Sequence, residues 1–384
     1  MRIAYVTETY PPELNGVSLT VDRTVRHLRE RGHEVELIRP RQPSESACDD
    51  DDEWRTSGFP IPMYPDLRFG LASSTRLQQR FERTRPQLVH VATQGPLGRA
   101  AVRAALALDV PATSDFRTNF HQYSRYYGLG WLAPVVCDYL RRFHNQTRRT
   151  FVPTPAVRDE LARAGFERLA VVGRGVDTEH FSPKKRSAAL RAQWGCDDAP
   201  VLLYVGRLAA EKNVQLALCA FDAVRTRLPT ARMVVVGDGP MRRRLEAHFP
   251  AARFVGVLRD EALAQHYASA DLFLFPSLTD TFGNVTLEAL ASGLPVVAYD
   301  QAAAAVHVDD CDSGLLVTPG DERAFVAAAC SLAWQHQYLA SVRQRARTAA
   351  LRARWDDVLL RFETQLAETV CALEPASADE ACVA

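Results

Sequence analysis

The sequence predicts an α/β protein of two domains, each built on a parallel sheet. With 384 residues, of which 47% are apolar, the chain is long enough for two cores of domain size. Short apolar runs alternate with longer stretches whose apolar residues recur at helical spacing, and sequential strand–helix units of this kind form parallel sheets. The alternation restarts near residue 199 after a polar stretch, so the two halves are interpreted as separate domains.

The first half opens with a strand, a loop and a helix. Residues 2–7 are a strand, the loop ETYPPELNG runs to Gly16, and an apolar stripe predicts a helix that Gly32 ends. Residues 34–38 are the next strand, which makes a Rossmann-like start without the G-x-G-x-x-G of dinucleotide-binding proteins. Further strands are predicted at 88–92, 110–116, 151–154 and 169–172, and further helices at 97–108, 131–149 and 155–164.

Three segments of this half carry notable charge. The acidic run at 49–53 is interpreted as a solvated loop rather than a paired-aspartate metal site, because no strand precedes it. Residues 59–80 are proline-rich, then basic and amphipathic, which suits either a domain-edge loop and helix or a segment touching a membrane surface. The helix at 131–149 is either solvated on its basic side or faces an anionic lipid or acceptor. That side carries Arg141, Arg142, Arg148 and Arg149.

The second half repeats the strand–helix pattern. Its predicted strands are 201–205, 232–236, 253–257, 272–275, 295–299 and 314–317, with helices between them and a largely helical stretch at 321–354. We divide the chain into a first domain at 1–175, a linker region at 176–198 and a second domain at 199–350. A C-terminal helix follows within 351–369, and the composition of 370–384 predicts a disordered tail.

Composition limits the classes of function. The formal net charge is 0, so there is no bulk electrostatic case for a nucleic-acid partner. The 8 cysteines include no C-x-x-C pair, which argues against zinc fingers and a disulfide framework and suits a reducing compartment. No signal peptide precedes the first strand, and no apolar run reaches about 18 residues. We expect a cytoplasmic protein whose contact with the inner face of the cytoplasmic membrane, if it has one, is peripheral.

The candidate binding residues of the second half follow its strands. Arg207 and Lys212 come after the strand at 201–205, where fixed positive charge would stabilise a diphosphate leaving group. A surface ion pair between Glu211 and a neighbouring cation is the alternative.

A second group of candidates surrounds a helix start. Asp280 and Glu288 lie on either side of it, and the first residues of the helix are Phe282, Gly283 and Asn284. A helix N-terminus favours a phosphate, and a glycine lets a ligand approach the backbone closely. An ordinary buried strand–helix unit with two surface acids is the alternative interpretation.

Two strings carry a family resemblance. TDTFGNVTLEALASGLPVV and GRLAAEKN resemble retaining glycosyltransferases of family 4, whose GT-B fold has two Rossmann-like domains facing across a cleft. Asp280-x7-Glu288 is similar to the family's E-x7-E motif, with aspartate as its first acid. The resemblance implies that Asp280 contacts the donor sugar, that Glu288 binds the ribose, and that Arg207, Lys212 and the backbone from Phe282 to Asn284 bind the diphosphate. It covers roughly residues 1–366 and implies that the last helix packs back on the first domain.

The resemblance also assigns residues near other strands. Gly16 matches a glycine-rich loop that faces the donor phosphates, and the backbone near Val257 would meet the nucleobase. Arg117, in SDFRTNFH, stands where relatives usually have a histidine at the reaction centre, and His121 lies four residues further on. The candidate catalytic residues are therefore Arg117, His121 and Asp280, with a packing role as the alternative for His121.

The strings TETYPPELNGVS, SDFRTNFH and YPDLRFGL resemble bacterial GDP-mannose-dependent α-mannosyltransferases. This implies transfer of mannose to a glycolipid or glycan acceptor in an α linkage. We expect no cofactor, and no metal is needed if Arg207, Lys212 and the helix N-terminus neutralise the diphosphate. A UDP-sugar donor of the glucose type is the alternative. Because Arg117 and Asp280 depart from the family pattern, a nucleotide-sugar-binding protein without activity also stays open. A nucleotide-sugar epimerase would share the architecture, although GRLAAEKN and the paired acids favour transfer.

Overall fold

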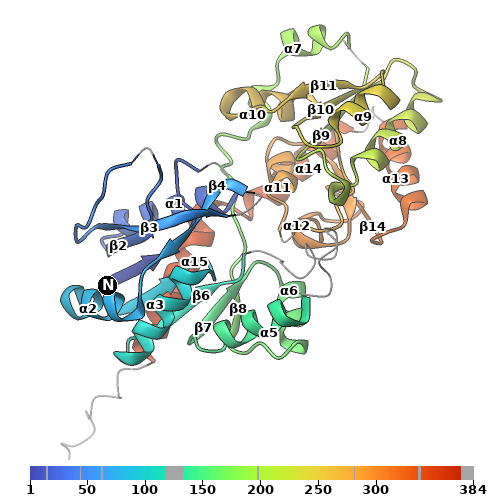
Figure 1. Ribbon diagram of the computed structural model, residues 1–384. Coiled ribbons are helices and arrows are strands. Elements are labelled where there is room, and N and C mark those ends of the chain that lie inside the picture. The colour runs from blue at the N-terminus through green and yellow to red at the C-terminus, as the bar shows by residue number, and fades with distance from the viewer. Residues whose placement is uncertain are drawn as a thin grey trace, which may run out of the picture. The chain divides into compact units, whose positions relative to one another are not determined.

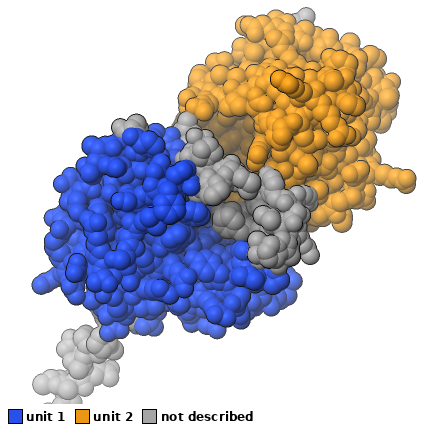
Figure 2. Space-filling model, in the orientation of Figure 1, with its two compact units in different colours: residues 1–173, 359–384 blue, residues 174–358 orange. Residues whose placement is uncertain are grey.

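The computed structural model describes residues 1–13, 16–43, 45–61, 64–117, 133–196, 199–280, 282–335 and 339–372, with the backbone alone at 61, 64–67 and 133. The chain divides into two compact units, which Figure 2 distinguishes by colour. Unit 1 comprises residues 1–173 and 359–384, and unit 2 comprises residues 174–358.

Unit 1 is built on a sheet with the strand order β4-β3-β2-β1-β5-β6-β7-β8 (Figure 1). Neighbouring strands are parallel except β3 and β4, which form an antiparallel hairpin at the edge. The strands are β1 (Arg2–Val6), β2 (Glu34–Pro40), β3 (Glu53–Ile61), β4 (Tyr64–Leu71), β5 (Leu88–Val91), β6 (Ala112–Asp115), β7 (Arg149–Val152) and β8 (Leu169–Val171).

The hairpin of β3 and β4 was not predicted from the sequence, where residues 49–53 were interpreted as a solvated loop and 59–80 as a loop and helix or a membrane-contacting segment. Pro60 lies in β3 beyond residues 53–56, the part that pairs with β2. A proline there removes no ladder bond from the sheet interior, which is why an edge hairpin accepts it.

Helices cover both faces of this sheet, and the side chains of β1 point alternately into two cores. Ala4 and Val6 pack in a core that α2 and α3 complete, whereas Ile3 and Tyr5 pack in a core completed by α1 and α15. The helices of unit 1 are α1 (Gly16–Glu30), α2 (Ser74–Thr84), α3 (Pro96–Ala107), α5 (Ala133–His144), α6 (Pro155–Arg163) and, for most of its length, α15 (Trp355–Cys371).

The prediction of one basic helix over 131–149 is wrong in the extent of the helix. α5 ends at His144, and Arg149 begins β7. Arg141 and Arg142 both pair with Asp138, at 2.7 and 2.9 Å. The Arg149 guanidinium instead donates to the side chains of Gln365 (2.6 Å) and Glu368 (3.0 Å) on α15. The four arginines therefore do not form one basic helix side.

Unit 2 is built on a parallel sheet with the strand order β11-β10-β9-β12-β13-β14. One helical layer includes α8 packed on α13, and another includes α11 packed on α14 and α10 (Figure 1). The strands are β9 (Val201–Val205), β10 (Arg232–Val236), β11 (Arg253–Gly256), β12 (Leu272–Phe275), β13 (Val296–Tyr299) and β14 (Gly314–Val317). The helices are η2 (Pro183–Lys185), α7 (Ala188–Gln193), η3 (Ala210–Lys212), α8 (Val214–Arg225), α9 (Arg242–His248), α10 (Asp260–Ser269), α11 (Asn284–Ala291), α12 (Ala302–His307), α13 (Glu322–Trp334) and α14 (Leu339–Leu351).

The central strands of unit 2 are buried throughout, as their continuous apolar sequences predict. Their carboxyl ends meet at one edge of the sheet, where parallel α/β sheets bind ligands. The residues of interest in unit 2 follow β9, β11 and β12 at this edge.

Candidate active site

Two loops meet at the carboxyl edge of the unit 2 sheet. β9 and β12 are parallel neighbours, so the loops that follow them leave the sheet on the same side. The loop after β9 contains η3, and the loop after β12 leads to α11. The backbone N–H of Leu278 donates to Glu211 O at 3.2 Å, which joins the two loops directly.

This junction places a lysine against an aspartate. Lys212 Nζ donates to Asp280 Oδ1 at 2.7 Å, and the two side chains are 13% and 19% exposed. The second oxygen, Asp280 Oδ2, is buried and accepts no hydrogen bond from the residues that the structure describes. Buried acceptors are rarely left unpaired, because the loss of their hydration is not offset. Asp280 therefore keeps an acceptor available for a hydroxyl group beside a fixed cation.

The start of α11 lies next to this ion pair. Gly283 is the N-cap residue, with φ of +86°, and it provides no side-chain cap. A Cβ at this position would lie 3.5 Å from Phe275 Cε1 and 3.6 Å from Asp280 Cβ, which is ordinary contact. The left-handed backbone, rather than lack of space, is what favours glycine here. Because no side chain caps the helix, its first N–H groups suit an anion.

Glu288 lies on the second turn of α11 and is held by a tyrosine. Tyr267, in α10, donates its hydroxyl to Glu288 Oε2 at 2.9 Å. Burial raises the pKa of Glu288 to about 7, although the hydrogen bond from Tyr267 acts in the opposite direction. The carboxyl group is therefore poised between its neutral and charged forms near neutral pH.

The other predicted residues of unit 2 differ in exposure. Arg207 is exposed in the turn after β9, and its carbonyl accepts a hydrogen bond from the Tyr204 hydroxyl at 3.3 Å. Val257 follows β11 and is 60% exposed. The Phe282 side chain is a core residue, 2% exposed, so only its backbone could contact a ligand. Unit 2 thus brings Lys212, Asp280 and the start of α11 together at one edge.

Arg117 lies at the carboxyl end of β6 in unit 1, and its side chain points inward to the buried Asp115. Arg117 Nε donates to Asp115 Oδ2 at 2.6 Å, and His90 Nε2 lies 3.2 Å from the same oxygen. Burial alone would raise the pKa of Asp115, but the charge of Arg117, together with His90, lowers it to about 2. The guanidinium of Arg117 is therefore engaged by a buried carboxylate. Gly16 is the exposed first residue of α1, and His121 lies outside the described residues.

Family models match both halves of the chain. Residues 14–180 match the model described as Glycosyltransferase Family 4, and residues 199–334 match Glycosyl transferases group 1. A GDP-mannose-dependent alpha-mannosyltransferase of Mycolicibacterium smegmatis is 36% identical over 344 residues, which are 86% of this chain and 88% of that one. The chain belongs to glycosyltransferase family 4.

Other relatives of this glycosyltransferase show how far the likeness extends. A sulfoquinovosyl transferase of Arabidopsis thaliana is 32% identical, over 83% of this chain and 64% of its own length. The solved sucrose-phosphate synthase of Thermosynechococcus elongatus has a TM-score of 0.76 at 18% identity, covering 97% of this chain and 99% of that one. The predicted GT-B fold class, two parallel-sheet α/β domains, is confirmed, and the protein is a hexosyltransferase.

Two residues at these edges of the glycosyltransferase were not predicted from its sequence. One is Tyr267, whose partner Glu288 lies on another helix, so no local pattern could have found it. The other is Glu8, two residues after the end of β1, which is 8% exposed and accepts a hydrogen bond from the N–H of Leu97 at 2.9 Å. A Cβ on Gly95 would lie 1.6 Å from Glu8 Oε2, so this glycine makes room for the carboxyl group. An acid directly after the predicted first strand was the signal available.

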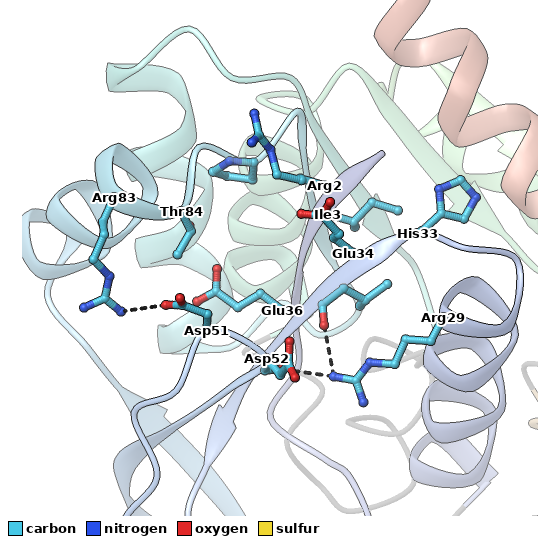
Figure 3. A pocket seen from close by; sticks show the side chains of 12 residues that line it. Arg2, Ile3, Arg29, His33, Glu34, Glu36, Asp51, Asp52, Arg83 and Thr84 are labelled. Carbon is cyan, nitrogen blue, oxygen red and sulfur yellow. Dashed lines mark hydrogen bonds and ion pairs between the residues drawn. The ribbon is translucent and has the colours of Figure 1, made fainter.

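The acidic run at 49–53 is a site of ion pairs. Asp49 pairs with Arg80, and Asp51 lies 3.5 Å from Arg83. Figure 3 shows Asp51 and Asp52 beside a pocket that Arg2 and Glu34, the first residues of β1 and β2, also line. That pocket therefore lies at the amino edge of the sheet, opposite the predicted site residues of unit 1.

Two further observations concern the described part of the chain. No group of three or more histidine, cysteine, aspartate or glutamate residues is arranged there to hold a metal ion. None of its helices has both the length and the hydropathy that a membrane span requires.

Proposed function

We propose that this glycosyltransferase moves mannose from GDP-mannose to a glycolipid or glycan acceptor and forms an α linkage with retention of configuration. Its relatives support the donor, since GDP-mannose-dependent mannosyltransferases among them reach 32–36% identity over most of the chain. The observation that carries the chemistry is the Lys212–Asp280 pair beside the uncapped start of α11.

The roles follow from where charge develops. When the bond between the sugar's C1 and the diphosphate oxygen breaks, negative charge grows on the leaving GDP. Lys212, Arg207 and the first N–H groups of α11 stabilise that charge, so we assign no metal to the reaction. The acceptor oxygen forms the new bond on the face that the diphosphate leaves, and its proton passes to the leaving phosphate.

The carboxylates hold the donor. Asp280 Oδ2, which accepts no hydrogen bond within the described residues, takes a sugar hydroxyl, and Glu288 takes the ribose hydroxyls. Donor binding draws Lys212 toward the phosphates, so the Lys212–Asp280 contact is shared with the donor. The backbone at Val257 lies at the same sheet edge and would meet the base.

A donor screen tests the proposal. Purified protein is incubated with GDP-mannose, UDP-glucose, UDP-galactose, UDP-N-acetylglucosamine and UDP-glucuronate, each with and without a lipid extract and in the presence of EDTA. We expect GDP-mannose to be the only one of the five donors that releases nucleoside diphosphate. This release should depend on lipid and should not be affected by EDTA. Consumption of a UDP-sugar would overturn the donor, and dependence on added metal would overturn the metal-free assignment.

A donor that carries another sugar, such as a UDP-sugar of the glucose type, is the second candidate. The Arabidopsis thaliana relative is a sulfoquinovosyl transferase at 32% identity, so proteins this similar transfer different sugars. The acceptor is open for the same reason, and the lipid arm of the screen addresses it. Product analysis would distinguish transfer from epimerisation, since an epimerase needs no acceptor.

A further inference from the structure

The hydroxyl group of Tyr267 is fixed from several sides in unit 2. Tyr267 is 0% exposed. Its ring packs edge-on against Phe181, with 5.6 Å between centroids, and tilted against Phe273, with 5.8 Å between centroids. These neighbours come from the segment before η2 and from β12. Moving the ring to another χ1 rotamer would open a cavity in this core, so the hydroxyl has one stable position.

The helix that carries Glu288 is fixed by an independent contact. Arg347, in α14, donates to Ala291 O at 2.6 Å and to Phe181 O at 2.8 Å. The last turn of α11 and the backbone of Phe181, whose ring packs on Tyr267, are therefore held by one side chain. As a result, Tyr267 Oη and Glu288 Oε2 meet between two rigid elements rather than between mobile loops.

We propose that Tyr267 is a positioning residue whose hydroxyl orients the Glu288 carboxylate for the ribose of the nucleotide donor. The inference rests on the proposed function, which assigns Glu288 to the ribose. Tyr267 donates to Oε2 and so fixes the plane of the carboxylate, which directs Oε1 toward the ribose hydroxyls. A carboxylate accepts these hydroxyls best in its charged form, and a hydrogen bond from a neutral donor favours that form.

The hydrogen bond from Tyr267 changes the pKa of Glu288 in a direction that can be measured. Burial raises the pKa of Glu288 to about 7, and the Tyr267 hydrogen bond opposes that rise. Removing the hydroxyl would therefore move the pKa further upward and leave less carboxylate near neutral pH. A tyrosine that only filled space would have no such effect on the pH profile.

The test is Tyr267→Phe, which keeps the packed ring and removes one oxygen. Binding of GDP and of UDP is measured by titration calorimetry from about pH 6 to about pH 9, with the 2′-deoxy form of whichever nucleotide binds. We expect about tenfold weaker binding near pH 7. The midpoint of the pH profile should move upward, and the penalty for the missing 2′-hydroxyl should shrink. In turnover, KM for the donor should rise while kcat at saturation stays within about twofold.

Tyr139→Phe is the matched control, because the Tyr139 hydroxyl also donates one hydrogen bond, to Gln94 O at 2.9 Å in unit 1. It should leave nucleotide binding unchanged. If Tyr267→Phe keeps the wild-type pH midpoint and the full 2′-hydroxyl penalty, the inference is wrong. Wild-type protein that binds a nucleotide but turns over no donor would refute the proposed function while leaving this binding test intact. Wild-type protein that binds neither nucleotide would overturn both.

Discussion

Lys212 Nζ lies 2.7 Å from Asp280 Oδ1, so a cation assigned to the donor phosphate is paired with an acid assigned to the donor sugar. The pair joins the loops after β9 and β12, which are distant in sequence. It holds the lysine near the start of α11, and the charge is in place before the diphosphate leaves.

Replacing Lys212 by alanine should lower kcat by roughly 100- to 1,000-fold, because one of the charges that stabilise the leaving diphosphate is lost. Release of nucleoside diphosphate at saturating donor measures the effect. Lys184→Ala removes an exposed lysine of the same unit and should leave kcat unchanged. Near-normal turnover by the Lys212 variant would contradict the assignment.

Asp280→Glu restores the first acid that family members usually carry. The added methylene must fit where Asp280 Oδ2 is already buried, and it displaces the oxygen that Lys212 contacts. We expect kcat/KM for the donor to fall about tenfold. An increase in kcat/KM would instead indicate that the natural aspartate impairs catalysis, which is the alternative left open by the sequence.

The main role expected of the Arg117–Asp115 pair is to stabilise the folded protein. Asp115 is 4% exposed, and removing its cation leaves a buried charge with less compensation. Arg117→Met should lower the free energy of unfolding by about 3 kcal/mol, and adding Asp115→Asn should recover part of that loss. Urea unfolding checks both variants. Unchanged stability of the Arg117→Met variant, together with a large loss of kcat, would show that Arg117 acts in the reaction instead.

Glu8 should make the stability of unit 1 depend on pH. Burial raises the pKa of Glu8 from 4.5 to about 7, against the opposing hydrogen bonds from backbone N–H groups. Below pH 4.5 both the folded and the unfolded protein keep this proton; between 4.5 and 7 only the unfolded protein releases it, so stability falls as pH rises. Above that range the loss is complete, and it amounts to about 3 kcal/mol.

Glu8→Gln should remove this part of the pH dependence, so the variant gains stability relative to the wild type as pH rises. Urea unfolding at pH values below and above the range measures it. Glu34→Gln, at an exposed carboxylate of the same unit, serves as the control. Parallel pH profiles for the wild type and the Glu8 variant would contradict the assignment.

The strand–helix periodicity was enough to predict most of the parallel strands, because most of them are short apolar runs between polar turns. β3 and β4 were missed because Gly58, Pro60 and the neighbouring prolines are typical of loops, and an edge hairpin tolerates them. The length of α5 was wrong for a related reason: residues 145–148 carry helix-compatible side chains, yet Arg149 pairs in the sheet.

The placement of candidate residues at a sheet edge could be predicted where they follow strands, as Lys212 and Asp280 do. Lys212, Asp280 and Glu288 all come from strings with recognisable spacing. The partners of Glu288 and Arg117 could not be predicted. Tyr267 meets Glu288 between two helices, and Asp115 meets Arg117 because the arginine side chain turns inward. Such contacts depend on how elements pack, and a single sequence carries no periodic signal for them.

The place of α15 in the core has a consequence for the order of synthesis. Phe362 and Leu366 complete the core that Ile3 and Tyr5 begin, while residues 174–358 form the other unit. A ribosome releases the first residues of unit 1 long before it has made the helix that covers them. Unit 2 can therefore fold while the chain grows, whereas unit 1 keeps an apolar face exposed until α15 has been made. Interrupted translation would leave the amino-terminal half as the aggregation-prone part of the enzyme.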